Sequence, residues 1–321
     1  MLRYAVVGSG AVGGFYGIRL AAAGADVQFL VRRGAAVVRD RGLTLTSPEG
    51  TLHLPSVRVA GSWDQLEPVD VLLVAVKATA NPDVLANLAG RTGLVAPGGA
   101  VLLVQNGIGV EGSYAATGLP VLGGLAFLCS QRRDPAHIAH LDFGALTIGA
   151  HADGGAPGGI TPLMDAIAAD LAAAGTEVHL DADLVRARWR KLMWNVPFNP
   201  LSVILDATTD LLMADPDTVA LVTRVMQEVA AAAAAEGREL PGTLIADLLA
   251  ATAAMTPYAT SMKLDADAGR PLEVDVMLAE PLRRAARTGV PMPTVAALHD
   301  QVAFLDRRAR AVGAAGQSAA V

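Results

Sequence analysis

The sequence has a single cysteine, Cys129, among 321 residues. One cysteine can form neither an internal disulfide nor a cysteine-based zinc site, a usage typical of proteins in the reducing cytoplasm. Charged residues are also scarce, at 17%, and the net charge of −6 leaves no basic excess for nucleic-acid binding. We therefore expect a cytoplasmic protein that binds no nucleic acid and packs Cys129 into a core.

Long apolar runs are missing as well, although 52% of the residues are hydrophobic and the mean hydropathy is +0.41. The apolar N-terminal segment imitates a signal peptide, but glycines interrupt it at positions 8, 10, 13, 14 and 17. No other stretch approaches the roughly 18 uninterrupted apolar residues of a membrane span. The composition predicts large buried cores and no membrane segment.

A chain of 321 residues suggests two domains of about 100 to 200 residues each. In residues 1–181, short apolar runs alternate with helical segments, which is typical of a parallel sheet covered by helices on both faces. Segments 12–23 and 161–174 are predicted helices, and 44–59 is predicted to form an edge excursion. The predicted strands are 2–7, 26–31, 69–76, 100–105, 121–127, 146–148 and 177–180.

Strand patterns stop near residue 182, and long helical patterns follow, separated by glycine and proline breaks. We predict an all-helical second domain over residues 182–312 and a frayed tail at 313–321. The size and apolar content of this domain suggest a homodimer formed through it. The predicted helices are 184–205, 218–236, 243–254, 272–288 and 294–310.

The first predicted strand leads directly into a glycine-rich turn and then into a helix, which is the context of a Rossmann-type dinucleotide site. Gly8 permits a tight turn, Gly10 lets the backbone approach a pyrophosphate, and Gly13 allows close packing of helix on strand. The helix N-terminus would face the phosphates. A glycine turn packed for its own sake is the alternative. The predicted cofactor-binding run is Gly8, Ser9, Gly10, Ala11, Val12 and Gly13.

Arg32 and Arg33 follow the second predicted strand, where an NAD site usually has an acidic residue. A guanidinium can pair with a 2′-phosphate, whereas a carboxylate would repel it. We therefore predict NADPH (NADP) as the cofactor, with Arg32 as the main phosphate ligand and Arg33 as a secondary one. Two ordinary surface arginines are the alternative.

Two further strands are predicted to end at Lys77 and at Asn106-Gly107. Open parallel sheets bind ligands outside the carboxyl ends of their strands, so we expect both at the cofactor edge. Asn-Gly is also a common turn pair, which is the alternative for Asn106. Only three lysines, Lys77, Lys191 and Lys263, stand beside 22 arginines. In such a chain a lysine indicates a position that needs a compact or deprotonatable ammonium.

Lys191, Asn195 and Asn199 are spaced four apart, so a helix places them on one face of an otherwise apolar segment. Polar groups embedded in an apolar helix need partners, so this stripe is expected to face a ligand or a wet cleft. Pro197 should disturb the helical hydrogen bonds and free a carbonyl. A polar edge that merely faces solvent is the alternative.

Residues 260–265 are predicted to close a helix, and Gly269-Arg270-Pro271 to open the next one, with Pro271 as its first residue. Glu273 would then lie in the first turn, where the helix dipole favours a carboxylate. That is a sufficient structural explanation of Glu273, and the residues alone do not choose between it and catalysis.

The sequence lacks the motifs of metal enzymes, hydrolases and kinases. The six histidines form no helix-borne ligand pattern, so we expect no metal, and His137 and His140 are placed in a proline-bounded surface loop. No nucleophile elbow and no GxxxxGK phosphate loop is present, which disfavours hydrolases and kinases.

Taken in order, these residues resemble the ketopantoate reductases, also called 2-dehydropantoate 2-reductases, over nearly the whole chain. The resemblance implies NADPH-dependent reduction of ketopantoate to (R)-pantoate, a step toward pantothenate and coenzyme A. Besides the glycine run and Lys77, it rests on Gln105-Asn106-Gly107-Ile108-Gly109, Trp189-Arg190-Lys191-Leu192, Asn195, Asn199-Pro200-Leu201, Ser261-Met262 and Gly269-Arg270-Pro271 before Glu273.

The resemblance also implies roles for single residues. Lys191 would be the general acid that protonates the carbonyl oxygen as hydride arrives, and its ammonium would stabilise the developing alkoxide. Glu273 would lie beside the substrate and the cofactor and hold the active arrangement. Lys77 would lie near the nicotinamide, while Lys263 matches nothing and is expected at the surface. Asn106, Asn195, Asn199 and Ser261 would surround the substrate, and Asn106 would also reach the cofactor.

The chain departs from the family pattern after Asp275, where an Asn-Gly pair is common but Val276-Met277-Leu278 stands here; Thr260-Ser261 also replaces the usual Ser-Ser. The first change could alter the substrate pocket. Two alternatives therefore stay open: a reductase of another 2-oxo acid or an imine, and a non-catalytic protein that binds NADPH and contacts a partner. A sensor would need no proton donor, which favours an enzyme.

Overall fold

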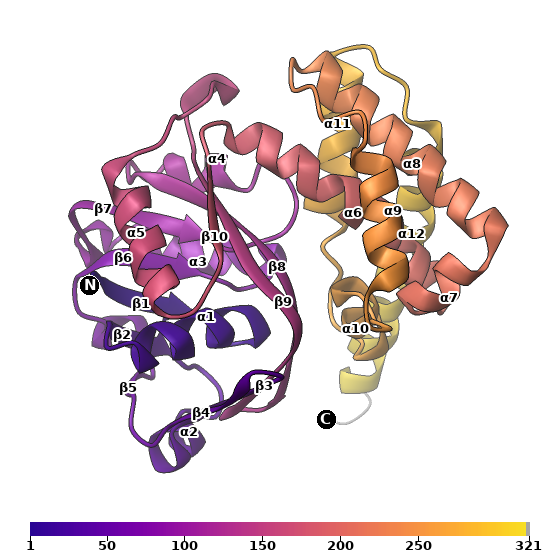
Figure 1. Ribbon diagram of the computed structural model, residues 1–321. Helices are drawn as coiled ribbons and strands as arrows, with labels where there is room; N and C mark the ends of the chain where they lie inside the picture. The colour runs from indigo at the N-terminus through magenta and orange to yellow at the C-terminus, as the bar shows by residue number, and fades with distance from the viewer. Residues whose placement is uncertain (319–321) are drawn as a thin grey trace. The chain divides into compact units, whose positions relative to one another are not determined.

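The computed structural model describes residues 1–318, with side chains described through residue 312. The chain forms two compact units (Figure 1). Unit 1 contains Met1–Asn106 and Val110–Ala187, and unit 2 contains Gly107–Gly109 and the chain from Arg188 onward. The sequence pattern places the boundary at 181/182 and keeps residues 107–109 in the first domain, whereas the structure groups that tripeptide with the helices.

Unit 1 is built on one mostly parallel sheet with the strand order β4-β3-β9-β8-β7-β6-β1-β2-β5, and β10 also pairs with β9. Two pairs, β3/β4 and β8/β9, are antiparallel. The strands are β1 (Arg3–Val7), β2 (Asp26–Leu30), β3 (Leu43–Ser47), β4 (Gly50–Leu54), β5 (Arg58–Ala60), β6 (Val69–Val74), β7 (Val95–Leu103), β8 (Val121–Asp134), β9 (His137–Ala150) and β10 (Val178–Asp181).

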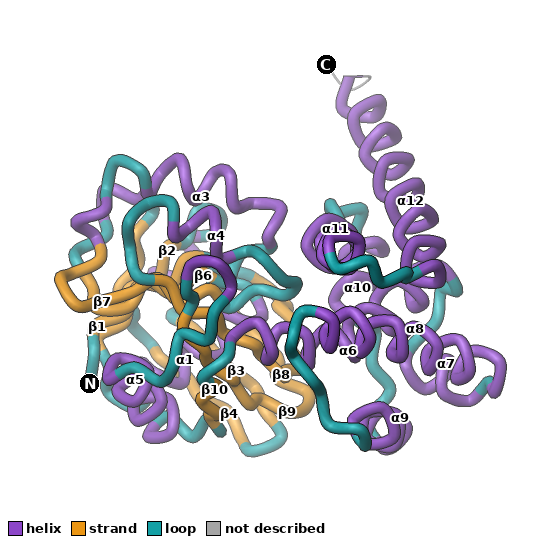
Figure 2. The backbone as a smooth tube through the Cα atoms, turned by 90° about the horizontal axis from the view of Figure 1, so that it is seen from above, coloured by secondary structure: helices purple, strands orange, loops and turns teal. Residues whose placement is uncertain are grey.

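Helices cover both faces of this sheet: α1 and α5 pack on one face, and α3 lies on the other (Figure 2). Branched side chains such as Leu73, Ile148 and Ile167 form part of the core between the sheet and its helices, and they are fully buried. Gly24, with φ at +95°, follows α1 in the left-handed conformation predicted for it. The helices are α1 (Ala11–Ala22), α2 (Ala35–Arg41), α3 (Asn81–Leu88), α4 (Glu111–Ala115) and α5 (Pro162–Ala173), with single 3-10 turns η1 (Trp63–Gln65), η2 (Ala78–Ala80), η3 (Thr92–Leu94) and η4 (Asp153–Gly155).

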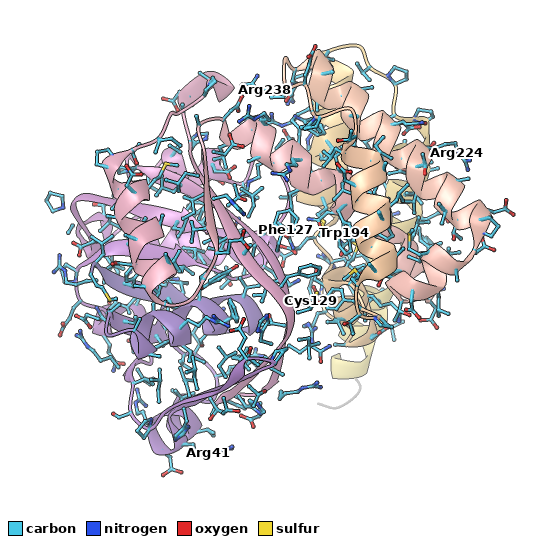
Figure 3. The ribbon with its side chains drawn as sticks, in the orientation of Figure 1. Arg41, Phe127, Cys129, Trp194, Arg224 and Arg238 are labelled. Atoms are coloured by element: carbon cyan, nitrogen blue, oxygen red, sulfur yellow. The ribbon has the colours of Figure 1, made fainter. Side chains whose placement is uncertain are left out.

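The long β8/β9 hairpin was only partly predictable. The sequence predicts strands at 121–127 and 146–148 alone, and its surface loop for His137 and His140 is wrong, because both residues lie on β9. Pairing shifts register between Phe127 and Leu128 and twice more along the hairpin, which breaks the alternation that would have indicated a strand. Cys129 on β8 is buried, which confirms its predicted core position (Figure 3).

His140 has a specific structural task in this hairpin. Its Nε2 lies 2.6 Å from the carbonyl oxygen of Phe143, which can only accept, so Nε2 carries the hydrogen. Its Nδ1 lies 2.9 Å from the hydroxyl of Ser47, and this hydrogen bond ties β3 to β9. The predicted edge excursion at 44–59 is confirmed, although it divides: β3 and β4 extend one edge of the sheet and β5 the other.

Unit 2 is all helical, so the predicted combination of a Rossmann-type sheet and a helical second domain is confirmed. Among the boundaries that differ from the prediction, Ser261 begins a helix rather than closing one, and the helix after Pro271 begins only at Val274. The elements are α6 (Leu184–Ile204), α7 (Thr209–Ala214), α8 (Pro216–Ala235), α9 (Leu244–Ala254), α10 (Ser261–Asp267), the π-helical turn η5 (Asp275–Ala279), α11 (Glu280–Arg287) and α12 (Pro293–Ser318).

The last helix runs further than predicted. A frayed tail is expected at 313–321, but α12 continues through Ser318, and residues 319–321 lie outside the described chain. Among the described helices, α8 alone is long and apolar enough to cross a membrane by length and composition. Core helices pass the same test, and α8 packs against α7, α9, α11 and α12, with Val225, Met226 and Val229 fully buried.

Candidate active site

The carboxyl ends of four strands meet in one row of unit 1. In the parallel ladders Val7 pairs with Leu30 on one side and with Val74 on the other, and Val74 pairs with Leu103. The segments that follow, which carry Gly8, Arg32, Lys77 and Asn106, therefore leave the sheet at the same edge. This confirms the prediction that these strand ends converge, at the place where open parallel sheets bind ligands.

The glycine turn after β1 is required by close packing at two positions. A Cβ on Gly8, whose φ is +99°, would lie 2.8 Å from the backbone nitrogen of Val76, and one on Gly13 would lie 2.3 Å from the carbonyl oxygen of Gly8. At Gly10 the same atom would meet no protein atom within 4 Å. Protein packing therefore does not explain Gly10, which leaves the backbone at the start of α1 open to a phosphate group.

Arg32 and Arg33 are exposed just beyond the end of β2. Gly34, with φ at +81°, then turns the chain into α2, a helix that the sequence analysis did not identify. Both guanidiniums are thus exposed at the edge of the sheet that carries the glycine turn, and the residues present fit a dinucleotide cofactor. Among the described residues, no cluster of three or more histidine, cysteine or acidic side chains suits a metal ion.

The polar stripe of α6 is confirmed as a single helix face that is largely buried. Asn195 is 3% exposed and Asn199 is 1% exposed, while Lys191 is half-buried. A polar edge that merely faces solvent is therefore excluded for the two asparagines. The apolar side of the helix packs on α9, where the indole of Trp194 donates to the hydroxyl of Thr252 at 3.0 Å (Figure 3).

Asn199 joins α6 to the first turn of α10. Its Oδ1 accepts the backbone N–H of Met262 at 3.2 Å and the hydroxyl of Ser261 at 3.4 Å, while its Nδ2 donates to the carbonyl oxygen of Asn195. The structure thus brings together Asn195, Asn199 and Ser261, three of the residues predicted to surround a substrate. The Oδ1 of Asn199 is committed to this contact, so the residue also positions Ser261.

Thr260 reinforces the same joint. Its hydroxyl lies 2.6 Å from that of Ser202 on α6 and accepts the N–H of Lys263 as the N-cap of α10. Both hydroxyl-bearing residues are fully buried. The Thr260-Ser261 pair therefore keeps both hydroxyls of the family's Ser-Ser. Lys263 was expected at the surface, but its side chain is only 12% exposed and pairs with Asp206 at 2.6 Å.

Glu273 lies in the loop before η5, not in the predicted first helical turn. The N–H of Leu272 donates to Asp306 on α12 at 2.9 Å, which holds this loop out of the helix. Arg270 binds Asp265 at 2.8 Å and ties the start of the loop to α10. Glu273 itself is 4% exposed. The sequence pattern did not indicate Asp265 or Asp306, because each stands beside other charged residues that give a helix an ordinary polar face.

Val276 is the first of the three residues that depart from the family pattern. It contacts Gly107–Gly109, the short segment that belongs to unit 2. Its carbonyl oxygen accepts the N–H of Ile108 at 3.1 Å, and a Cβ on Gly107 would lie 2.6 Å from the Cβ of Val276. A π-helical turn leaves a carbonyl free of the usual helical partner, and such turns are frequent at functional sites. Position 276 therefore holds the chain directly after Asn106.

Glu280, which begins α11, is bound by three arginines. Arg283, Arg284 and Arg287 donate to its two carboxylate oxygens at 2.7, 3.1 and 3.3 Å. Partial burial raises the pKa of this carboxyl, but the hydrogen bond from Arg283 and the charges of its neighbours outweigh burial and hold the pKa below its ordinary value. Glu280 is therefore an anchor for α11 and not a proton donor near neutral pH.

The fold and these two sets of residues define a class: a dinucleotide-binding protein with an appended helical unit, in which a half-buried lysine and two buried asparagines lie along one helix face. Comparison with models of protein families assigns the chain to one family within this class. Residues 4–153 match the model described as ketopantoate reductase PanE/ApbA, and residues 183–306 match its C-terminal model. The chain belongs to the ketopantoate reductase family, as the sequence resemblance predicts.

Individual relatives agree with this assignment. The chain is 43% identical to the 2-dehydropantoate 2-reductase of Nostoc sp. over 96% of both chains. The crystal structure of 2-dehydropantoate 2-reductase from Geobacter metallireducens is similar with a TM-score of 0.88 and 36% identity, over 96% of this chain and 100% of that one. A D-mandelate dehydrogenase bound to NADH and anilino(oxo)acetate shares the fold, with a TM-score of 0.83 at 20% identity, over 96% of this chain and 99% of that one.

Proposed function

We propose that this protein reduces ketopantoate to (R)-pantoate with NADPH, the 2-dehydropantoate 2-reductase reaction of pantothenate and coenzyme A biosynthesis. The observation that supports it most directly is the buried stripe of α6, where Asn195 and Asn199 connect to Ser261 beside Lys191. An amine and several amide and hydroxyl groups match a substrate with a carbonyl, a hydroxyl and a carboxylate.

Reduction of a ketone adds a hydride to carbon and a proton to oxygen. The bound nicotinamide supplies the hydride, and we assign the proton to the ammonium of Lys191. The same positive charge stabilises the oxygen as it becomes negative, which lowers the barrier. Glu273 is assigned to hold the active arrangement beside the substrate and the cofactor. Asn106, Asn195, Asn199 and Ser261 are assigned to the hydroxyl and carboxylate of the substrate.

The family uses a nicotinamide dinucleotide, and we propose NADPH rather than NADH for this chain. Support comes from the exposed Arg32 and Arg33 after β2, in a segment where an acidic residue would instead favour a free ribose hydroxyl. The glycine run, Gly8 to Gly13, is assigned to the pyrophosphate, and Lys77 to the nicotinamide end.

A second substrate remains a candidate because Val276-Met277-Leu278 departs from the family pattern next to Gly107. A related enzyme would reduce a different 2-oxo acid, or an imine, with the same acid and cofactor. A protein that only binds NADPH is the weaker candidate, since it would need no proton donor at the position of Lys191.

One experiment separates these candidates: the purified protein is mixed with NADPH or NADH and a panel of 2-oxo acids, and absorbance at 340 nm is followed. We expect the highest kcat/KM for ketopantoate with NADPH. A higher value for another oxo acid would reassign the substrate and keep the chemistry. Binding of NADPH without turnover of any oxo acid or imine would favour the non-catalytic candidate.

Two further assignments accompany this function. We place the reaction in the cytoplasm, consistent with a single cysteine, Cys129, which is buried. We also propose a homodimer formed through the helical unit, supported by large exposed apolar side chains there such as Leu211 and Phe304. Light scattering of the purified protein, with and without a Phe304→Glu substitution, tests the second assignment.

A further inference from the structure

A buried network of three polar side chains lies directly beneath the ligand edge of unit 1. Gln105 and Asn81 face each other as a reciprocal amide pair: Nε2 of Gln105 donates to Oδ1 of Asn81 at 2.7 Å, and Nδ2 of Asn81 donates to Oε1 of Gln105 at 3.2 Å. The Oδ1 of Asn81 also accepts the hydroxyl of Tyr114 at 2.9 Å. All three residues are at least 92% buried, with exposures of 8%, 5% and 0% for Asn81, Gln105 and Tyr114.

A further hydrogen bond of Gln105 gives the network its position. Its Nε2 donates to the backbone carbonyl of Val76 at 2.9 Å. Val76 is the residue before Lys77, and Asn81 is the first residue of α3, directly after η2. One side chain therefore binds both ends of the short segment that carries Lys77. The N–H of Ala80 closes that segment on the carbonyl of Lys77 at 2.9 Å.

Gln105 is also the residue immediately before Asn106. Its backbone leaves β7 at the level where the segment with Lys77 leaves β6, because Val74 and Leu103 are paired. The side chain thus links the departure points of Lys77 and Asn106. Both residues are half-buried and are the ones assigned here to the nicotinamide end and to the substrate.

Only an amide can make this set of bonds. Both hydrogens of Nε2 are used, one on Asn81 and one on Val76, and Oε1 accepts the remaining bond. A carboxylate at position 105 would place an oxygen against two acceptors, and a methionine would leave the carbonyl of Val76 and the amide of Asn81 without these bonds. Burying two amides this deeply costs free energy unless every donor and acceptor has a hydrogen-bond partner. Two apolar side chains would fill the same space without that cost.

We propose that Gln105 is a positioning residue for the reaction: its side chain sets the separation and orientation of Lys77 and Asn106 at the ligand edge. The proposal rests on the function assigned above, since Lys77 and Asn106 are taken to contact the cofactor and the substrate. Small displacements of groups that hold reacting partners reduce turnover strongly, whereas a purely structural residue changes stability alone.

The test compares Gln105→Met with Tyr114→Phe. The second substitution removes one hydrogen bond from the Asn81 amide, but it leaves the three hydrogen bonds of the Gln105 side chain described above intact. For each variant, the thermal midpoint, kcat, both KM values and the Kd for NADPH are measured. We expect Gln105→Met to lower kcat/KM about 10- to 100-fold, while Tyr114→Phe keeps kcat/KM within about twofold for a comparable loss of thermal stability.

A double-mutant cycle makes the test independent of simple unfolding. In a Lys77→Ala background, Gln105→Met should reduce kcat/KM by much less than in the native background, because the group that it positions is already absent. Asn81→Ala, which leaves the bond from Gln105 to Val76 in place, serves if Gln105→Met does not fold, and an intermediate loss is expected. Equal fold-losses in both backgrounds, or Gln105 and Tyr114 variants that change stability alone, overturn the proposal.

Failure of the assigned function gives a different result. If the native protein turns over no 2-oxo acid or imine, the reductase assignment fails, but the Kd for NADPH still reports on position 105. Gln105→Met should then weaken NADPH binding more than Tyr114→Phe does. Identical Kd values for the two variants in a protein without turnover would remove Gln105 from a positioning role.

Discussion

The Oδ1 atom of Asn199 lies 3.2 Å from the backbone nitrogen of Met262 and accepts its hydrogen, across 63 residues of chain. This bond makes Asn199 part of the fold of unit 2 as well as a candidate substrate residue. Because the acceptor is fully buried, its loss leaves a donor without a partner. A substitution at this residue is therefore expected to lower stability, whatever its effect on substrate binding.

We expect Asn199→Ala to lower the free energy of unfolding by about 1 to 3 kcal/mol, the usual effect of leaving a buried donor unsatisfied. Urea titration followed by circular dichroism measures this loss. The control is Asn87→Ala on α3, where the amide binds only the carbonyl of Asp83 at the helix surface. The control should change the free energy by less than about 0.5 kcal/mol, and equal losses would contradict the role of Asn199.

Lys191→Ala should lower kcat about 10²- to 10⁴-fold, the usual contribution of a general acid, and leave the Kd for NADPH nearly unchanged. Lys191→Arg keeps the positive charge but cannot release a proton near neutral pH, so it should also be slow. Lys263→Ala is the matched control, because that lysine pairs with Asp206 and Asp267. Near-native turnover by both Lys191 variants would remove this residue from acid catalysis.

Arg32→Asp should shift coenzyme preference toward NADH. A carboxylate at this position would repel a 2′-phosphate and could bind the ribose hydroxyls instead. We expect the ratio of kcat/KM for NADPH to that for NADH to fall by at least about tenfold, the equivalent of one charge-assisted hydrogen bond. An unchanged ratio would assign phosphate binding to another residue, and Arg33→Asp is the first variant to test then.

Gly107→Ala should be far more damaging than Gly98→Ala. Both glycines have positive φ, +91° and +83°, so both substitutions carry a similar backbone strain of about 1 to 2 kcal/mol. A Cβ at Gly98 meets nothing within 4 Å, whereas one at Gly107 would lie 2.7 Å from the carbonyl oxygen of Val276. We expect Gly107→Ala to cost about 1 to 3 kcal/mol more than its control in urea unfolding. Equal costs would show that Val276 does not constrain this loop.

Stability should fall in acid partly through Glu280. Its pKa is lower in the folded chain than in the unfolded chain, so the unfolded state takes up the proton first. The contribution is complete above the unfolded pKa of about 4.3 and is lost as the pH falls through the lower folded value. The difference in unfolding free energy between the native chain and Glu280→Gln should therefore shrink from pH 7 to pH 3. Glu239→Gln, at an exposed position in unit 2, is the control for loss of one charge.

Local patterns predicted much of the fold. The glycine turn, α1 and Gly24 follow from residue types over a few positions, and α6 follows from a spacing of four along one face. Local patterns also predict that Arg32, Lys77 and Asn106 lie at the same edge of the sheet. This requires only that the strands before them are parallel, so that their carboxyl ends meet at one edge. These features need no knowledge of distant contacts.

Other features depend on contacts that no local pattern encodes. The β8/β9 hairpin has register shifts, so its polar residues, His137 and His140 among them, lack strand alternation. Glu273 stays outside the helix because Leu272 is bound by Asp306, 34 residues away. The sequence places Lys263 at the surface, but in the fold its side chain pairs with Asp206, which follows the end of α6, and is largely buried.

The sequence by itself determined the dinucleotide fold, the helical second unit and the family, because each rests on short-range periodicity or on residues that are consecutive in the chain. Only the tertiary structure decided which amides anchor distant parts of the chain, as at Gln105 and Asn199. Hydrogen-bond partners are set by three-dimensional proximity at about 3 Å, and two chains with the same local pattern can pair the same amide differently.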